Sequence, residues 1–452
     1  MSYNYLGGKM NNIKITGYGD DLTINGIRIG DLSPFEHEQI EKEKGGNNYH
    51  PLENVVVSSV FDDTTFIARK PDPEKIKKFL EFELIDGLCC YSAVNPGQLN
   101  KTIVDAIVSH LQMEKIPTVP RSIRHKYMSA LLIAVTAFTE MDKMVPKVAG
   151  VEGPEMMFKI ARRWAYEQKG VPEGKALTIV AENNFHGRSM FAISASTDPL
   201  SRKDFGPFLP GIIKVPYNNI PAIEQAITEN AEFLSAVILE PIQGEAGVIV
   251  PSDDYLPAVK KLCEEHNVLF CLDEVQTGYC RTGANFAHQL WNAKPDLMSC
   301  GKAAGGGIIP VSYVAGRADV IDVLSPGSEG STFGGYPLAC IAAVYSIKVM
   351  IEENLAEMAR IRGKRLLKHF ADIQKEFPNK MKETRGKGLL TAFEMYKAPQ
   401  LDGHQVSLKL LKKGVYAKET HKSIVRVAPS LTITEKNIDT IAEAIRDVIK
   451  EL

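Results

Sequence analysis

Residues 269–278 read LFCLDEVQTG, in which an apolar run meets charged and polar residues. The first four residues, Leu269 to Leu272, form an apolar run that is typical of a strand buried on both faces. The run ends in two adjacent carboxylates, Asp273 and Glu274. Because an ionised carboxylate at the edge of a core is costly without a partner, we expect Asp273 to have one.

Apolar runs alternate with helical patterns along the middle of the chain. The runs are ALTIVAE, SAVILEPI, VLFCLDEV, PDLMSCGK and IPVSYVAG, at 176–182, 235–242, 268–275, 295–302 and 309–316. This alternation predicts an α/β fold with a mainly parallel sheet covered by helices. Ligands of such folds bind beyond the carboxyl ends of the strands, which is where Asp273 and Lys302 fall.

The C-terminal third predicts a second, smaller domain. A long helical pattern after Pro337 is suited to joining two domains, and GKGLLTAFEM, SIVRVAPSL and a closing amphipathic helix near 435–452 follow it. We therefore expect a small α+β domain at the C-terminus. The predicted parts are an N-terminal extension of unknown role (1–46), a segment packing with the small domain (47–100), a large cofactor-binding domain (101–345) and the small domain (346–452).

The composition excludes several classes of protein. Lysine plus arginine (53) nearly balance aspartate plus glutamate (55), so the net charge of −2 attracts neither nucleic acid nor anionic lipid. The seven cysteines are odd in number and form no CxxC pair, which predicts reduced, mostly buried thiols and no metal site. The sequence has no apolar run as long as a membrane span and no recognisable targeting segment, so we expect a cytoplasmic protein.

Lys302 and Asp273 form the central chemical pattern. Lys302, in CGKAAGGG, follows an apolar strand and lies 29 residues after Asp273, about one strand-helix-strand step. Taken separately, a solvated loop lysine and a turn-capping aspartate are the ordinary interpretations. Pyridoxal phosphate (PLP) explains both together, because its aldehyde bonds to a lysine amine and an aspartate keeps its ring nitrogen protonated.

Three further features suit the same cofactor. A turn at Gly150 and Val151 leads into a helical pattern, so its backbone N–H groups can hold a phosphate. Ser331 and Thr332, in GSTFGG, offer hydroxyls beside glycines, and Phe185, in NNFHGRS, can cover one face of the ring. Each feature is weak alone, because glycine turns and loop aromatics are usually structural. Their order along the chain favours PLP.

Ten segments resemble those of the class III, fold-type I aminotransferases, and in particular the ornithine aminotransferases. They are NNYHPL, YSAVN, NFHGRS, STDP, FGPFLPG, EPIQGEAGV, DEVQTGYCRTG, GKAAGGG, GSTFGG and RGKGLL, and the likeness runs from about residue 47 to the C-terminus. The resemblance implies a fold-type I PLP enzyme that transfers the δ-amino group of L-ornithine to 2-oxoglutarate. The products would be glutamate and glutamate 5-semialdehyde, which cyclises to pyrroline-5-carboxylate. It also implies a homodimer, in which Thr332 reaches the phosphate of the neighbouring subunit.

The resemblance further implies a role for each matching residue. Arg426 would clamp the α-carboxylate of glutamate or 2-oxoglutarate, and Glu245 would mask that arginine when ornithine is bound. From the sequence alone, the ordinary interpretation of two residues so far apart is that they never meet. The implied catalytic residues are Lys302 and Asp273; the cofactor contacts are Gly150, Val151, Phe185, Gln276 (to the ring hydroxyl), Ser331 and Thr332; the substrate contacts are Tyr49, Tyr91, Arg188, Glu245 and Arg426.

The chain departs from the family pattern at several positions. Val148 and Ala149 stand where Asn-Thr is usual, which predicts a missing hydroxyl contact to the phosphate. PGQLN follows YSAVN, IARKPDPEKIKKFLEF replaces a recognisable hairpin, and Tyr336 stands where an asparagine is usual. Two alternatives therefore stay open: another ω-aminotransferase, acting on acetylornithine, 4-aminobutyrate or lysine, and a catalytically weak paralogue with a binding role. Tyr49 favours ornithine, because a free α-amine needs a polar partner.

Overall fold

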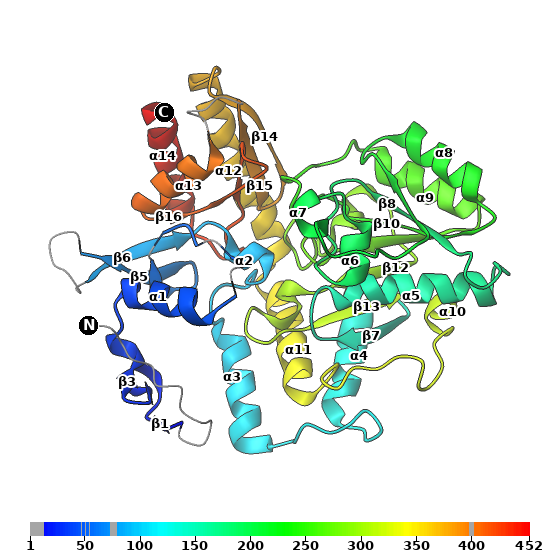
Figure 1. Cartoon of the computed structure of the whole chain (residues 1–452), viewed down its shortest axis with the longest axis horizontal. Helices are drawn as coiled ribbons and strands as arrows, with labels where there is room; N and C mark the ends of the chain where they lie inside the picture. The colour runs from blue at the N-terminus through cyan, green and yellow to red at the C-terminus, as the bar shows by residue number, and fades with distance from the viewer. Residues whose placement is uncertain (1–12, 47, 50, 54, 73–78, 397–401) are drawn as a thin grey trace. The chain divides into compact units, whose positions relative to one another are not determined.

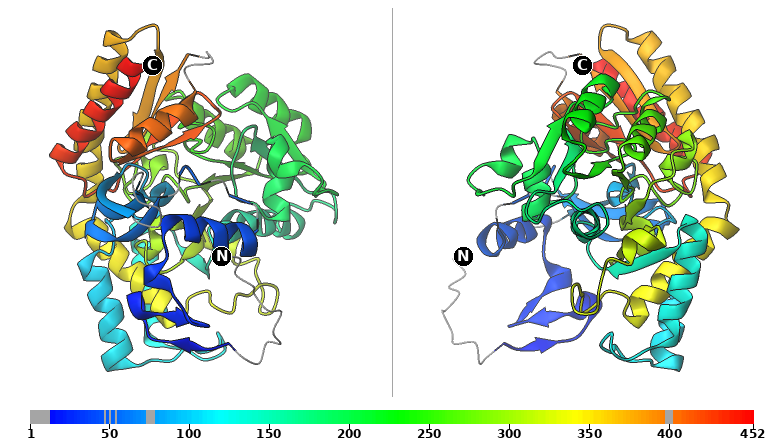
Figure 2. Two further views of the ribbon diagram at one scale, coloured as in Figure 1. Left: turned by 60° about the vertical axis from the view of Figure 1, so that its left-hand side comes forward. Right: turned by 90° about the vertical axis from the view of Figure 1, so that its right-hand side faces the viewer.

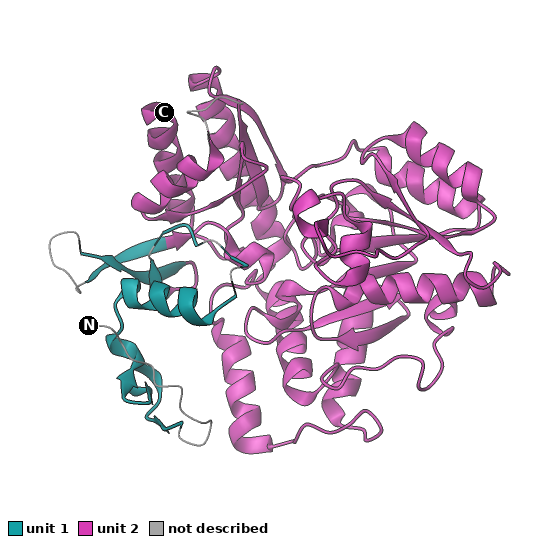
Figure 3. Cartoon of the chain, in the orientation of Figure 1, with its two compact units in different colours: residues 1–61, 65–84 teal, residues 62–64, 85–452 magenta. Residues whose placement is uncertain are grey.

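The computed structural model describes residues 13–46, 48–49, 51–53, 55–72, 79–396 and 402–452. The chain divides into two compact units (Figure 3). Unit 1 comprises residues 1–61 and 65–84, and unit 2 comprises residues 62–64 and 85–452. The boundaries that the sequence suggests after residues 46, 100 and 345 stay predictions.

The described residues of unit 1 form a small three-stranded sheet, an α-helix and strands of a second sheet. β1 (Ile15–Thr16), β2 (Thr23–Ile24) and β3 (Ile27–Arg28) form an antiparallel sheet, with short 3-10 helices at Gly19–Asp21 and Ile29–Asp31. α1 (Pro34–Lys44) begins with a capping box, in which the side chains of Ser33 and Glu36 each accept the other's backbone N–H. β4 (Val56–Asp62), β5 (Thr65–Pro71) and β6 (Phe79–Asp86) follow. β5 and β6 are sheet neighbours, and the lysine-rich residues 73–78 between them lie outside the described residues.

A seven-stranded sheet forms the centre of unit 2. β12 is parallel to β11, and the parallel pairing continues through β10 and β8 to β9, which confirms the predicted α/β fold with a mainly parallel sheet. β13 is antiparallel to both of its neighbours. In spatial order the strands are β7 (Lys143–Lys147), β13 (Ser312–Gly316), β12 (Leu297–Cys300), β11 (Leu269–Asp273), β10 (Leu234–Leu239), β8 (Leu177–Ala181) and β9 (Ile212–Val215).

Helices cover both faces of this sheet, which explains the uninterrupted apolar run of β11. Leu269 and Cys271 pack in one cluster with α5 (Glu152–Glu167), whereas Phe270 and Leu272 pack in another with α8 (Ile220–Asn230) and α9 (Tyr255–Glu265). α8 and α9 lie together, and α5 runs along the sheet (Figure 1). Successive side chains of a strand point to opposite faces, so a strand covered on both sides needs apolar residues throughout.

The remaining helices of the large sheet region include two that pack against each other. α4 (Lys126–Thr139) and α11 (Pro337–Glu352) share a core cluster with Met144, Met298 and Tyr313 of the sheet. Tyr336 stands at the start of α11 without a side-chain cap, and its ring packs against Phe333. The shorter helices are α2 (Cys89–Ser92), α3 (Lys101–Ser109), η4 (His110–Glu114), α6 (Met190–Ala195), α7 (Pro199–Arg202), η5 (Ala287–Trp291), η6 (Lys302–Gly305) and α10 (Ala318–Ile321).

The helical pattern after Pro337 is broken into two helices, where the sequence suggested one long pattern. α11 ends at Glu352 and α12 (Leu355–Glu376) begins after Asn354, whose φ is +51°. Asparagine tolerates this left-handed conformation, so it can turn the chain between two helices whose apolar patterns continue. The apolar periodicity alone does not reveal such a break.

The C-terminal part of unit 2 has its own antiparallel sheet, in agreement with the predicted α+β pattern. Its strand order is β14 (Met381–Lys387), β15 (Leu390–Met395), β18 (Ile424–Val427) and β17 (Lys418–Thr420). α12 packs beside the β14–β15 hairpin and α14 (Glu435–Glu451) packs beside α12 (Figure 2). α13 (Gly403–Lys412) completes the layer, and β16 (Val415–Tyr416) pairs with Ile85 and Asp86.

Two sequence predictions concern the whole chain. Six of the seven cysteines are buried and Cys90 is exposed, which confirms mostly buried thiols. Among the described residues, no helix is both long and apolar enough to cross a membrane.

Candidate active site

A cavity of about 440 Å³ lies in unit 2 at the carboxyl ends of β11 and β12. β11 ends at Asp273, and Lys302 lies two residues beyond the end of the neighbouring, parallel β12. The prediction that these two residues end adjacent strands is therefore confirmed. Six of the predicted site residues line the cavity: Gly150, Val151, Phe185, Asp273, Gln276 and Lys302.

Asp273 has three hydrogen-bond donors, and its side chain is only 5% exposed. His186 Nδ1 donates to Oδ2 at 2.7 Å, while the Ser299 hydroxyl (3.0 Å) and the Val275 N–H (3.1 Å) donate to Oδ1. The bond from Val275 means that Asp273 also caps a turn, as the ordinary interpretation proposed. Burial lowers the pKa of His186, but the Asp273 carboxylate outweighs it and the pKa is raised overall.

His186 and Ser299 are residues that sequence reasoning missed. His186 directly follows Phe185, the predicted ring-stacking residue, so its position beside a cofactor candidate was an available signal. Ser299 lies in β12 opposite Asp273 in the parallel register, which becomes visible only when the two strands are paired. Both residues fix the orientation of the Asp273 carboxylate.

Glu274, the second carboxylate of the opening stretch, serves the loop that follows it. It is fully buried and accepts the backbone N–H groups of Ala287 (3.0 Å) and His288 (2.8 Å), together with the Thr277 hydroxyl. His288 Nδ1 also lies 3.1 Å from Glu274 Oε1, so four contacts from residues 277–288 converge on one side chain. The adjacent carboxylates therefore separate into one that faces the cavity and one that organises a loop.

Lys302 occupies a strained position at the start of η6. Its φ is +49°, a left-handed conformation that costs a non-glycine residue on the order of 1 kcal/mol. Among the described residues, none makes a hydrogen bond or ion pair with its amine. Burial lowers the pKa of Lys302, and the carboxylates of Glu245 and Asp273 only partly oppose this. The amine is therefore more easily deprotonated than that of an ordinary lysine.

Glycine at position 301 is required by a close approach of two backbone segments. A Cβ on Gly301 would lie 3.2 Å from the Cα of Gly150 and 3.3 Å from the Val275 side chain. The absence of a side chain brings the start of η6 next to the turn that leads into α5. Lys302 and the Gly150–Val151 turn consequently line one cavity.

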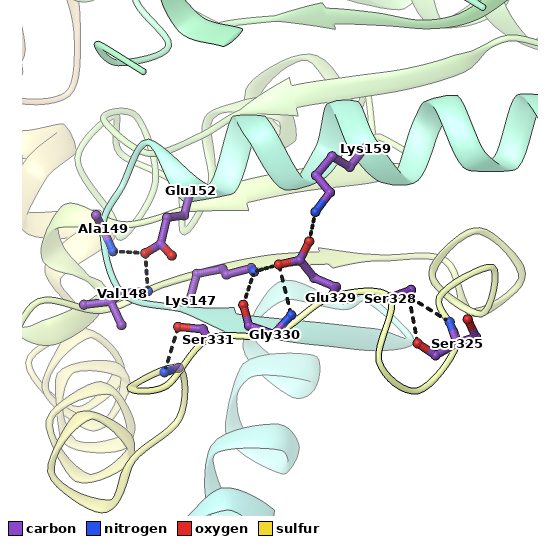
Figure 4. Close-up of polar contacts among 11 residues, drawn as sticks. Lys147, Val148, Ala149, Glu152, Lys159, Ser325, Ser328, Glu329, Gly330 and Ser331 are labelled. Carbon is purple, nitrogen blue, oxygen red and sulfur yellow. Dashed lines mark hydrogen bonds and ion pairs between the residues drawn. The ribbon is translucent and has the colours of Figure 1, made fainter. Parts of the chain in front are cut away.

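The turn before α5 has the properties of an anion site. Within the described part of the chain, the N–H groups of Gly150 and Val151 donate no hydrogen bond, and both residues line the cavity. They precede a helix of 16 residues, whose N-terminal end favours negative charge. The N–H groups of Val148 and Ala149, in contrast, donate to the Glu152 carboxylate at 2.9 and 2.6 Å (Figure 4).

Arg426 and Glu245 form a partly buried ion pair. Arg426 Nη1 lies 2.5 Å from Glu245 Oε1, and the two side chains are 3% and 29% exposed. The expectation from sequence alone that residues 181 apart do not meet is therefore wrong. Burial raises the pKa of Glu245, but the charges of Arg426 and Lys302 outweigh it and lower the pKa overall. The Arg426 guanidinium also lies 5.3 Å from the centre of the Tyr91 ring.

Two contacts from the C-terminal sheet hold the loop that carries Glu245. The Thr420 hydroxyl donates to the Glu245 carbonyl at 2.7 Å, and Arg385 Nε donates to the Gly247 carbonyl at 2.9 Å. Beneath this loop, Glu240 accepts the N–H of Phe185 (3.0 Å) and of Gly244 (3.3 Å), and burial raises its pKa to about 7. Sequence reasoning identified none of these three positioning residues.

Other predicted site residues lie outside the cavity lining. Arg188 is exposed, with its guanidinium 5.7 Å from the centre of the Phe185 ring. Ser331 is partly buried and Thr332 is exposed. Tyr49 belongs to unit 1 and is exposed. Their roles stay predictions.

Comparison with known proteins agrees with this geometry. The family described as aminotransferase class III matches residues 64–449. The ornithine aminotransferase of Oceanobacillus iheyensis is 42% identical over 406 residues, which cover 90% of this chain and 96% of that protein. The ornithine aminotransferase of Emericella nidulans is 39% identical over 431 residues, covering 93% and 91%.

Solved structures are similar over the same length. An ornithine aminotransferase from Toxoplasma gondii, with partial occupancy of PLP at its active site, has a TM-score of 0.84 and 33% identity, covering 92% of this chain and 94% of that one. An acetylornithine aminotransferase from Elizabethkingia anophelis has a TM-score of 0.80 and 34% identity, covering 93% and 100%. With the family match spanning most of its length, this chain belongs to the class III aminotransferase family.

Proposed function

We propose that this chain uses PLP to transfer the δ-amino group of L-ornithine to 2-oxoglutarate, giving glutamate 5-semialdehyde and glutamate. The observation that carries the proposal is the Arg426–Glu245 ion pair, in a protein whose cavity is lined by Lys302 and Asp273. An ornithine δ-aminotransferase must bind one substrate by an α-carboxylate close to the reacting carbon and the other with that carboxylate at its far end. A paired arginine that can be released meets both demands.

The residues lining the cavity fit PLP. The unused N–H groups of Gly150 and Val151 suit its phosphate, the Asp273 carboxylate suits its ring nitrogen, and the Gln276 amide suits its ring hydroxyl. Phe185 would cover one face of the ring. When bound, PLP supplies an aldehyde that joins to amines and a ring that withdraws electrons from the neighbouring carbon.

The chain's own residues would then move and hold protons. Lys302, with its lowered pKa, would take a proton from the δ-carbon of ornithine and deliver it to the carbon of the cofactor's aldehyde group. Asp273 would keep the ring nitrogen protonated, because a buried carboxylate favours a cationic neighbour. His186 and Ser299 would hold Asp273 in the required orientation.

Substrate recognition would depend on charged and polar side chains. Arg426 would clamp the α-carboxylate of glutamate or 2-oxoglutarate, with Tyr91 beside it. Glu245 would keep Arg426 occupied while ornithine is bound. Tyr49 and Arg188 would then hold the α-amino and α-carboxylate groups of ornithine.

We also propose that the active unit is a homodimer and that the protein is cytoplasmic. Thr332 is exposed and lies outside the lining of its own cavity, as a residue that reaches the phosphate of a neighbouring subunit would. A cytoplasmic location suits the buried, reduced thiols and the nearly balanced charge.

A panel of amine donors tests the proposed reaction. Purified protein with PLP is mixed with ornithine, acetylornithine, 4-aminobutyrate or lysine, and both the visible absorbance of the bound cofactor and pyrroline-5-carboxylate are followed. Ornithine should react fastest. A faster reaction with acetylornithine would support the second candidate, which the similarity to an acetylornithine aminotransferase motivates. No reaction with any amine would indicate a paralogue with a binding role.

Glu245→Ala should change the preference between the two substrates. With its partner removed, Arg426 would attract the α-carboxylate of ornithine as well, so ornithine would enter by the wrong end. The loss of one charge-assisted pair is worth roughly 1.5–3 kcal/mol, which is about one to two decades in relative rate. The ratio of ornithine to glutamate rates in single-turnover experiments should fall by that amount.

Glu376→Ala is a matched control, because it removes an exposed glutamate–arginine pair between α12 and α14. This variant should keep the wild-type ratio. An unchanged ratio of ornithine to glutamate rates in Glu245→Ala would mean that the ion pair of Glu245 and Arg426 is only structural.

A further inference from the structure

A cluster of three charged side chains lies beside the anion site without belonging to it. Glu329 contacts Lys147 Nζ through Oε1 at 2.5 Å and Lys159 Nζ through Oε2 (Figure 4). The side chains of Lys147 and Glu329 are only 5% and 14% exposed, whereas Lys159 is exposed. None of the three lines the cavity, and the proposed reaction assigns them no role.

The two lysines belong to the elements that form the anion site. Lys147 is the last residue of β7, three residues before Gly150, and Lys159 lies in α5, which begins just after Val151. Glu329 therefore ties one loop to both the strand and the helix that frame the unused N–H groups. Because the Glu329 carboxylate pairs with both the strand end and the helix, it restrains the loop more than an ion pair with only one of these elements would.

Glu329 directly precedes the residues predicted to hold a phosphate, Ser331 and Thr332. Lys147 Nζ also contacts the Gly330 carbonyl at 3.4 Å, and the Ser331 hydroxyl accepts the Gly334 N–H at 3.1 Å. A Cβ on Gly334 would lie 2.7 Å from the carbonyl oxygen of Pro146 in β7, so this loop packs closely against the strand. The loop is thus fixed at both ends, by charge at Glu329 and by close packing at Gly334.

The charge balance makes Glu329 the essential member of the cluster. Two ammonium groups share one carboxylate, and burial of Glu329 is outweighed by both lysines, which lower its pKa to about 2. Glu329 therefore stays ionised throughout the working pH range. Among the described residues, no other carboxylate forms an ion pair with the nearly buried Lys147 ammonium, so loss of Glu329 would leave this charge uncompensated.

We propose that Glu329, held by Lys147 and Lys159, is a positioning residue that fixes the 329–335 loop, so that this loop can recognise the phosphate group of the cofactor bound by the neighbouring subunit. Glu329 acts through Ser331 and Thr332 and does not itself touch the phosphate. The inference rests on the proposed use of PLP, but it does not depend on which amine is the substrate. The proposal predicts that loss of the Glu329 charge weakens binding of a cofactor that carries the phosphate and leaves binding of one without it nearly unchanged. The rest of the cofactor is recognised by other residues.

Glu329→Gln tests this, because it keeps the size of the side chain and removes its charge. The apoprotein is titrated with PLP and with pyridoxal, which differs only in lacking the phosphate, and cofactor absorbance gives each dissociation constant. For PLP the dissociation constant should rise about tenfold, because the Ser331 and Thr332 hydroxyls lose their fixed position, while that for pyridoxal changes less than about twofold. Equal losses for both ligands, or no loss, would overturn the proposal.

Two more variants separate positioning from stability. Asp322→Asn breaks the exposed ion pair between Lys143, in β7, and Asp322, which follows α10, and should alter neither dissociation constant. Glu329→Gln alone should lower the thermal midpoint, because it leaves the Lys147 ammonium uncompensated. Adding Lys147→Met removes that ammonium, so the thermal midpoint should rise again while the weaker binding of PLP persists. Recovery of PLP affinity together with stability would mean that the cluster is merely structural. Wild-type protein that binds neither ligand would instead contradict the proposed cofactor.

Discussion

Lys302→Ala is expected to abolish turnover while leaving the fold intact. A positioned side chain that transfers a proton contributes 10²–10⁴-fold, so kcat should fall by roughly two to four orders of magnitude. The fold should survive because no described residue makes a hydrogen bond or ion pair with the Lys302 amine, and alanine at φ +49° is no more strained than lysine. Formation of pyrroline-5-carboxylate measures the loss, and the thermal midpoint measures the fold.

Lys294→Ala serves as the control, since it removes an exposed lysine just before β12 where Lys302 follows that strand. Added methylamine should restore part of the activity of Lys302→Ala, because a free amine can carry out proton transfer in the vacated space. Near wild-type turnover of Lys302→Ala without an added amine would show that Lys302 is not the catalytic residue.

Asp273→Ala should give the second largest loss, for an electrostatic reason. The variant leaves a cationic ring nitrogen without its buried partner, and breaking a buried charge pair costs about 3–5 kcal/mol, roughly two to four decades in rate. His186 and Ser299 also lose their shared acceptor. The variant should therefore retain PLP weakly on dialysis and turn over slowly.

Ser299→Ala is the matched comparison for Asp273→Ala. It removes one donor to the carboxylate but keeps the charge, so transition-state stabilisation should fall by only about 1.5–3 kcal/mol, the usual value of a hydrogen bond to a charged group. Full activity and full cofactor retention in Asp273→Ala would mean that this carboxylate is only the turn cap that its bond from Val275 describes.

Much of the large sheet was predictable because burial on both faces leaves a direct trace in the sequence. The runs at 176–182, 268–275, 295–302 and 309–316 each contain one of the observed strands, and the run at 235–242 overlaps β10, which begins one residue earlier at Leu234. The direction of each strand was harder to predict from the sequence. β13 is antiparallel to β12, yet its apolar run resembles the others, because alternating packing against two helical layers is the same for either direction.

The pattern of apolar runs alone places Asp273 and Lys302 at the same edge of the sheet, since parallel strands joined by one crossover have their carboxyl ends on the same side. The sequence also places Gly150 and Val151 before a helix, because that turn is local. The pairs of distant residues, in contrast, follow from tertiary packing: Glu245 with Arg426, 181 residues apart, and Lys147 with Glu329, 182 apart. Local pattern determines which side chains are buried, whereas the partner of a buried charge depends on how separate elements pack, which no short stretch of sequence encodes.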